Sequence, residues 1–114
     1  MRSQVEEMID EAKQSIVQNA GRHLRLLVLY GSQARGEATS ESDIDLLALV
    51  DTDDPEIKKS VRDSVYGVMW RHDFLRLISL RFMTASEFST QTEKGYSFAR
   101  NVEEEGIIIW RAAA

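Results

Sequence analysis

Two short, mainly apolar runs, Leu24–Tyr30 and Ile44–Val50, lie on either side of a polar segment that begins with Gly31-Ser32 and ends with Asp43. Each run has the length and composition of a buried strand. Residues i and i+2 of a strand point to the same side of it. Asp43 and Asp45 are therefore predicted to present two carboxylates side by side at the leading end of the second strand.

Two carboxylates held this close repel each other, so a purely structural role for the pair is hard to explain. A bound divalent cation would remove the repulsion, and Mg²⁺ commonly uses one or two protein carboxylates together with substrate phosphates. The turn at Gly31-Ser32 would offer free backbone N–H groups to such phosphates. The alternative interpretation is that Asp43 caps a loop and Asp45 is an exposed strand residue.

Composition narrows the class of protein. A length of 114 residues predicts one domain spanning 1–114, and the apolar runs are too short to cross a membrane. The polar, acidic N-terminus does not resemble a secretory signal, so a cytoplasmic location is expected. The chain has no cysteine and its two histidines, His23 and His72, are far apart, which argues against thiolate or histidine-rich metal sites. A net charge of −5 makes broad binding to nucleic acid unlikely.

Helical and strand patterns alternate along the rest of the chain. A helix is predicted from Ser3 to about Asn19, with Ser3 and Glu6 as a capping box and Gly21 as its end. A second helix has Pro55 near its first turn and either Thr52 or Asp53 as its cap. Further elements are predicted at 32–36 (a short helical turn), 74–83 (a third strand), 84–93 and 96–105 (helices) and 107–111 (a final strand). The alternation predicts an α/β or α+β fold in which helices flank a small mixed sheet.

Two familiar phosphate-binding motifs are absent. Gly31 and Gly36 have the spacing of a P-loop, but no Gly-Lys-Ser/Thr follows them, and a GxGxxG pattern is missing.

The segment from Gly31-Ser32 through ten intervening residues to Asp43-x-Asp45 resembles the signature of the DNA polymerase β-like nucleotidyltransferase superfamily. Arg35-Gly36 and the segment 42–46 resemble the minimal nucleotidyltransferases of bacteria and archaea in particular. The segment 99–107 is also similar to the C-terminal end of one branch of that group.

This resemblance implies a function and assigns roles. The protein would transfer a nucleoside monophosphate, AMP from ATP or another NMP from its triphosphate, to a hydroxyl. Gly31 and Ser32 would hold the triphosphate, and Asp43 and Asp45 would bind Mg²⁺ as the catalytic residues. Arg35 would either contact phosphate or form an ion pair, and the sequence favours neither role over the other. The resemblance also suggests a HEPN-domain partner in a toxin–antitoxin pair, with this chain as the antitoxin. Self-association is left open.

One departure from the family pattern separates two hypotheses. Active members usually supply a third carboxylate from the next strand, where Ser79 is expected here, and no acid lies between Phe74 and Met83. Asp73 is about six residues upstream, or roughly 20 Å along an extended strand. Catalysis could be weak, could need one metal, could borrow a carboxylate from a partner, or could be lost, which would leave a nucleotidyltransferase-fold binding module. Arg76 and Arg81 are either ordinary surface residues or a small basic wall for an anionic partner.

Overall fold

The computed structural model describes residues 2–113 and shows a four-stranded mixed sheet with the strand order β3-β2-β1-β4. Strand β1 pairs antiparallel with β2 and β4, and β2 pairs parallel with β3. The predicted mixed sheet flanked by helices is therefore confirmed. The elements are α1 (Gln4–Ala20), a 3₁₀ turn (Gly21–His23), β1 (Leu24–Tyr30), α2 (Ser32–Arg35), β2 (Ile44–Val50), α3 (Pro55–Arg71), β3 (Ile78–Thr84), α4 (Ala85–Glu93), α5 (Ser97–Glu105) and β4 (Ile107–Arg111).

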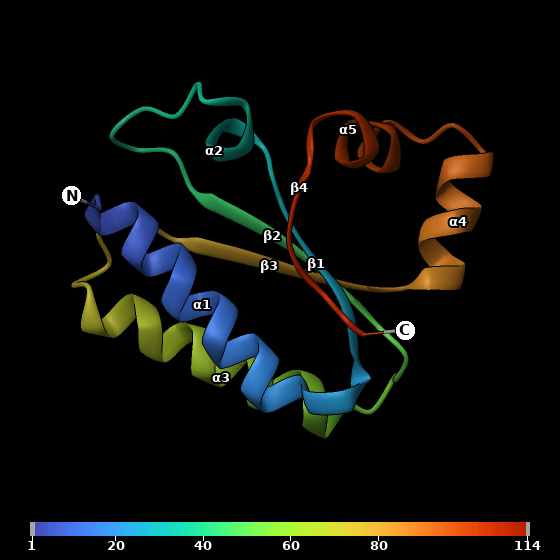
Figure 1. The fold of residues 1–114 in the computed structure, drawn as a ribbon, viewed down its shortest axis with the longest axis horizontal. Helices are drawn as coiled ribbons and strands as arrows, with labels where there is room; N and C mark the ends of the chain where they lie inside the picture. The colour runs from blue at the N-terminus through green and yellow to red at the C-terminus, as the bar shows by residue number, and fades with distance from the viewer. Residues whose placement is uncertain (1, 114) are drawn as a thin grey trace.

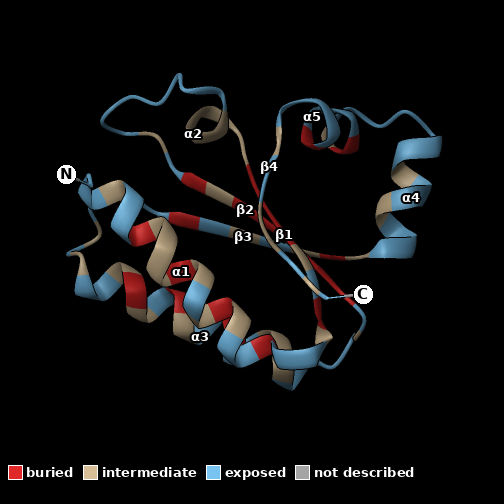
Figure 2. Ribbon diagram, in the orientation of Figure 1, coloured by how far each residue is buried: buried red, intermediate tan, exposed pale blue. Residues whose placement is uncertain are grey.

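The sheet separates two cores of unequal size. Helices α1 and α3 lie side by side on one face, and α4 and α5 lie on the other (Figure 1). The buried residues of α1 and α3 turn toward the sheet, and β1 and β2 are buried along most of their length (Figure 2). The smaller core, on the α4–α5 face, contains Val28, Leu47, Leu49, Met83 and Val102. No helix within residues 2–113 is both long and apolar enough to cross a membrane.

Local end signals place most helices where the sequence predicts them. The Ser3 side chain accepts a hydrogen bond from the Glu6 N–H, and Thr84 and Glu87 form a complete capping box at α4. The predicted cap of α3 is wrong: Asp54 caps it, rather than Thr52 or Asp53, and accepts a hydrogen bond from Glu56 N–H at 2.9 Å. Asp54 directly precedes Pro55, which occupies the first helical turn, so its carboxylate is the one that reaches the exposed N–H groups.

The predicted start of the third strand is also wrong, since β3 begins at Ile78 and not at Phe74. Asp73 and Phe74 both have left-handed backbone angles, and the Phe74 N–H donates to the carbonyl of Met69 in α3 at 2.8 Å. The Phe74 ring packs edge-on against Trp70, with ring centroids 5.2 Å apart. These contacts hold Phe74 against the end of α3. Residues 74–77 therefore do not form part of the strand, although their pattern predicts it.

Gly106 joins α5 to β4 at a point with no room for a side chain. A Cβ there would lie 2.4 Å from the carbonyl oxygen of Val102 and 2.6 Å from a methyl carbon of Val28. The backbone of Gly106 therefore sets how closely β4 and α5 approach β1.

We expect Gly106→Ala to destabilise the protein by about 1–3 kcal/mol, because overpacking forces the backbone apart. Gly67→Ala is the matched control: Gly67 lies in the interior of α3, where its Cβ would meet only the far end of the Arg71 side chain, at 3.5 Å. That change should stabilise the helix by up to about 1 kcal/mol. Urea denaturation of both variants measures the two effects, and equal stability of Gly106→Ala and wild type would contradict the first.

Candidate active site

Strand pairing brings three segments together around Asp45. Asp45 lies opposite Tyr30 at the end of β1 and beside Ser79 in β3. Because paired residues in neighbouring strands project from the same face, the Ser79 side chain is on the face of the sheet that carries Asp45. The structure thus places a hydroxyl, and no acid, next to Asp45 on β3.

The loop before β2 is closed by its own hydrogen bonds. The Thr39 N–H donates to the Ser42 hydroxyl at 2.8 Å, and the Ser42 N–H donates to the Thr39 carbonyl at 3.2 Å. The Gln33 side chain of α2 donates to the Ser42 carbonyl at 3.4 Å. The loop therefore returns the chain from α2 to the sheet, where Asp43 is exposed and Asp45 is half-buried.

Gly31 passes close enough to Asp45 to exclude every other residue. Its φ angle is +77°, and a Cβ at this position would lie 2.3 Å from a carboxylate oxygen of Asp45. Both the left-handed backbone and the missing side chain are therefore required. Ser32 follows as the first residue of α2, and its hydroxyl makes no hydrogen bond within residues 2–113.

The charge on Asp45 is poorly compensated. Burial raises the pKa of its carboxyl, the Asp43 carboxylate raises it further, and the Arg35 guanidinium lowers it. Within the described chain neither aspartate side chain forms an ion pair or a hydrogen bond. Two uncompensated carboxylates with free oxygens suit a hard divalent cation that completes its coordination with phosphates and water.

A larger protein-only metal cluster is absent from residues 2–113, which contain no group of three or more His, Cys, Asp or Glu side chains placed to hold a metal ion. The donor set at this site is therefore Asp43 and Asp45. This set fits a metal that shares its coordination with a substrate.

Arg35 forms ion pairs, which is one of the two roles that the sequence predicts for it. Its guanidinium contacts Glu37 and Glu105, each at 3.2 Å. Glu105 is the last residue of α5, so this pair fastens α5 to α2 beside the carboxylates. Sequence analysis did not identify Glu105, because 70 residues separate it from Arg35.

Three further side chains border the site: Tyr30 and Phe98, which were not assigned to it from the sequence, and Arg81, for which a basic wall was one of two predicted roles. The Tyr30 ring lies against Phe98 of α5, with centroids 5.3 Å apart, and the Arg81 guanidinium lies 3.9 Å above the Phe98 ring. Burial raises the pKa of the Tyr30 hydroxyl, the Asp45 carboxylate raises it further, and the Arg81 guanidinium lowers it. For Arg81, the signal in the sequence was its spacing of two residues from Ser79, which places both side chains on the same face of a strand.

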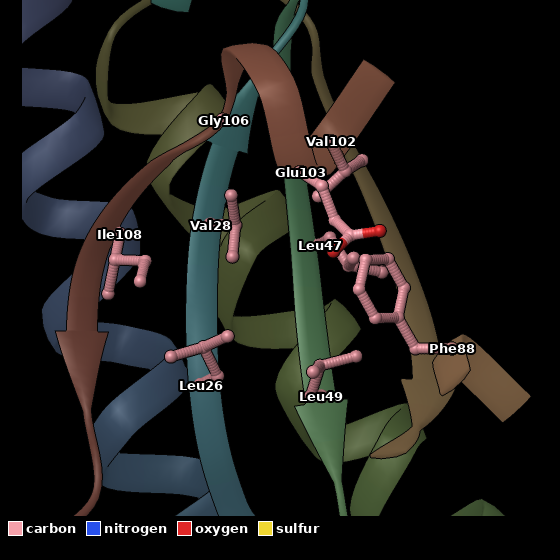
Figure 3. Close-up of a pocket in the computed structure, with 9 residues that line it drawn as sticks. All are labelled: Leu26, Val28, Leu47, Leu49, Phe88, Val102, Glu103, Gly106 and Ile108. Carbon is pink, nitrogen blue, oxygen red and sulfur yellow. The ribbon is translucent and has the colours of Figure 1, made fainter. Parts of the chain in front are cut away.

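An apolar cavity of about 240 Å³ lies on the same face of the sheet, one step further along the strands. Leu47 and Val28, two residues from Asp45 and Tyr30, line it together with Phe88 and Ile108 (Figure 3). Glu103 supplies the one charged side chain among its lining residues. The carboxylate site is thus continuous with a mainly apolar surface under α4 and α5.

Comparison with known proteins identifies the family. Residues 9–109 match the family model described as a nucleotidyltransferase domain. A candidate protein adenylyltransferase of Methanocaldococcus jannaschii is 34% identical over 89 residues, which cover 76% of this chain and 79% of that protein. The chain therefore belongs to the nucleotidyltransferase family.

Solved structures share the fold at low sequence identity. A toxin–antitoxin structure with AMP-PNP has a TM-score of 0.58 and 19% identity, over 89% of this chain and 72% of its own. A nucleotidyltransferase of Sulfolobus solfataricus has a TM-score of 0.55 and 18% identity, over 97% and 89%. An MNT antitoxin in complex with tri-AMPylated Shewanella oneidensis HEPN toxin gives 0.52 and 16%, over 92% and 73%.

The opposing effects of Asp43 and Arg35 on Asp45 give a direct test of the site geometry. Asp43→Asn should lower the pKa of Asp45, because it removes a like charge, and Arg35→Gln should raise it, because it removes an opposite charge. Carboxyl titration by NMR measures both, with Glu41→Gln, an exposed change in the same loop, as the control. An Asp45 pKa that does not respond to Asp43→Asn would mean that the carboxylates are too far apart to share a cation.

Proposed function

We propose that this protein is a Mg²⁺-dependent nucleotidyltransferase that transfers AMP from ATP, or the NMP of another nucleoside triphosphate, to a hydroxyl. The observation that carries the proposal is the pair of carboxylates, Asp43 and Asp45, which form no ion pair within the described residues, with Asp45 packed against the Gly31 turn. In the reaction the acceptor oxygen forms a bond to the α-phosphorus while the bond from that phosphorus to the bridging oxygen breaks. Pyrophosphate leaves, and the proton of the acceptor hydroxyl passes to a base.

Each residue has a role that follows from its place. Asp43 and Asp45 would hold Mg²⁺, which would neutralise charge on the phosphates and on the leaving pyrophosphate. Gly31 lets the backbone approach the substrate, and the free Ser32 hydroxyl would donate to a phosphate oxygen. Arg35 is proposed to contact phosphate as well, which requires it to exchange one of its two glutamate partners for the substrate.

The proposed acceptor is a hydroxyl on a HEPN-domain protein, with this chain acting as the antitoxin of the pair. The support comes from similar proteins: one relative is a candidate protein adenylyltransferase, and one structural neighbour is an antitoxin bound to an AMPylated HEPN toxin. Structural likeness at 16% identity supports the fold alone, so a protein acceptor is proposed from the 34% identical relative and the HEPN domain from the neighbouring complex.

Ser79 is the specific observation that favours a second candidate function. Because β3 carries no acid beside Asp45, the site has fewer metal ligands than two metals would need. In this second reading the fold binds a partner and neutralises it without turnover.

Labelled nucleotide transfer decides between the two functions. Wild-type protein incubated with Mg²⁺, α-labelled ATP and the HEPN-domain partner should label that partner, and Asp45→Asn should abolish labelling, since it removes a metal-binding carboxylate. Glu41→Gln, which keeps Asp43 and Asp45, is the matched control. Mg-ATP should also raise the melting temperature of the wild type, because it binds the folded state. A partner that binds tightly but remains unlabelled would favour the binding module.

Restoring an acid on β3 tests the importance of Ser79. Ser79→Asp should raise transfer to small hydroxyl acceptors, because general-base assistance is typically worth about 10²–10⁴-fold. Arg81, two residues further on the same strand, would reduce the gain by pairing with the new carboxylate. Rapid transfer by the wild type that Ser79→Asp leaves unchanged would show that a third carboxylate is dispensable or is supplied by another chain.

A further inference from the structure

Arg81 carries a positive charge that no acid of this chain neutralises in the structure. Its guanidinium rests on the Phe98 ring at 3.9 Å and forms no ion pair or hydrogen bond within residues 2–113. Arg81 is exposed and projects from the face of β3 that carries Ser79 and borders Asp45. An arginine that is held in place while its N–H groups remain free is suited to bind an anion.

Other arginines of this region differ in this respect. Arg35 is paired with two glutamates. Arg76 precedes β3, and its guanidinium donates to the carbonyl of Leu75 at 2.7 Å. Arg62 also stacks on an aromatic ring, that of Phe82, but Phe82 packs against the core under α1 and α3 on the opposite face of the sheet.

Strand pairing places Arg81 close to Asp45. Arg81 pairs with Leu47, and Asp45 pairs with Ser79, so Arg81 and Asp45 are diagonal neighbours on one face. With strands about 4.8 Å apart and a rise of about 3.3 Å per residue, such neighbours lie about 8 Å apart at their backbones, within reach of a long side chain. Tyr30 pairs with Asp45 and its ring contacts Phe98, the ring on which Arg81 lies, so these side chains border one region of the sheet face.

The charges at the site leave an excess of negative charge once substrate binds. A nucleoside triphosphate adds several negative charges to those of Asp43 and Asp45. One divalent cation balances only two of them, and the neutral Ser79 side chain adds no negative charge to hold a second cation. A fixed guanidinium would reduce the remaining excess without a second metal, and it would donate two parallel N–H bonds to phosphate oxygens.

We propose that Arg81, held over the Phe98 ring, forms a polyphosphate subsite beside Asp45 and supplies positive charge that a second metal ion would otherwise provide. This inference rests on the proposed function, because it names a further contact for the same nucleotide. The contact with Phe98 holds the Arg81 guanidinium on the face of the sheet that carries Asp45. Arg81 is thus a substrate-binding residue, and Phe98 is a positioning residue that acts through it.

Nucleotide binding by the folded protein tests this subsite without any need for turnover. Calorimetric titrations in the presence of Mg²⁺ compare ATP, AMP and inorganic tripolyphosphate on the wild type, Arg81→Met and Arg81→Lys. Methionine keeps an apolar chain on the Phe98 ring but removes the charge, and lysine keeps the charge. Arg62→Met is the matched control, because it removes the equivalent stack from the other face of the sheet.

Arg81→Met should lower the affinity for ATP and tripolyphosphate at least about 10-fold, which is the usual effect of losing hydrogen bonds to a charged group. The affinity for AMP should fall by less. The affinity of Arg81→Lys for ATP and tripolyphosphate should fall between those of Arg81→Met and the wild type. Arg62→Met should bind all three ligands as tightly as the wild type. The subsite would be overturned if Arg81→Met bound ATP as tightly as the wild type, or if its affinities for ATP and AMP fell by the same factor. A wild type that binds no Mg-ATP would instead overturn the proposed function, and the subsite with it.

Discussion

The pairing of β2 along its length with β1 on one side and β3 on the other is the constraint on which the rest of the molecule depends. Leu46, Leu47 and Ala48 are fully buried, so each face of this strand packs into a hydrophobic core. A shift of one residue in the register would exchange the two faces and turn Asp45 toward α1 and α3. The same register places Tyr30 and Ser79 on either side of Asp45. The packing of the sheet and the composition of the site are therefore consequences of one alignment.

The site is asymmetric in charge, and this asymmetry would let a protein with a net charge of −5 attract the proposed anionic substrate. Arg35 is neutralised by glutamates and serves to hold α2 against α5, while Arg81 is held by an aromatic ring that leaves its charge available. Two aspartates without partners provide the negative side of the same site. A cation would bind the carboxylates, and phosphates would bind the cation and the free guanidinium. Attraction of the substrate then depends on a few placed charges and not on the overall charge of the surface.

Family membership and chemistry rest on different kinds of evidence in this protein. Membership follows from the match over residues 9–109 and from a relative with 34% identity, whereas the solved structures, at 16–19%, share the fold. Chemistry depends on side chains that a fold does not specify. Here those side chains include Ser79 where an acid is expected and Arg81 two residues beyond it. The function is therefore argued from Asp43, Asp45 and their neighbours.

The sequence by itself determined the elements whose signals are local. Strands β1, β2 and β4 have the predicted bounds, and Ser3 is the predicted cap of α1, because burial runs and capping hydrogen bonds involve residues close in the chain. The motif from Gly31 to Asp45 was equally local. Tertiary structure alone decided the start of β3, where Phe74 packs back onto Trp70, and it alone brought Phe98 and Glu105 from α5 to the site. Those contacts join residues far apart in sequence, so they depend on strand order and register, which no local pattern records.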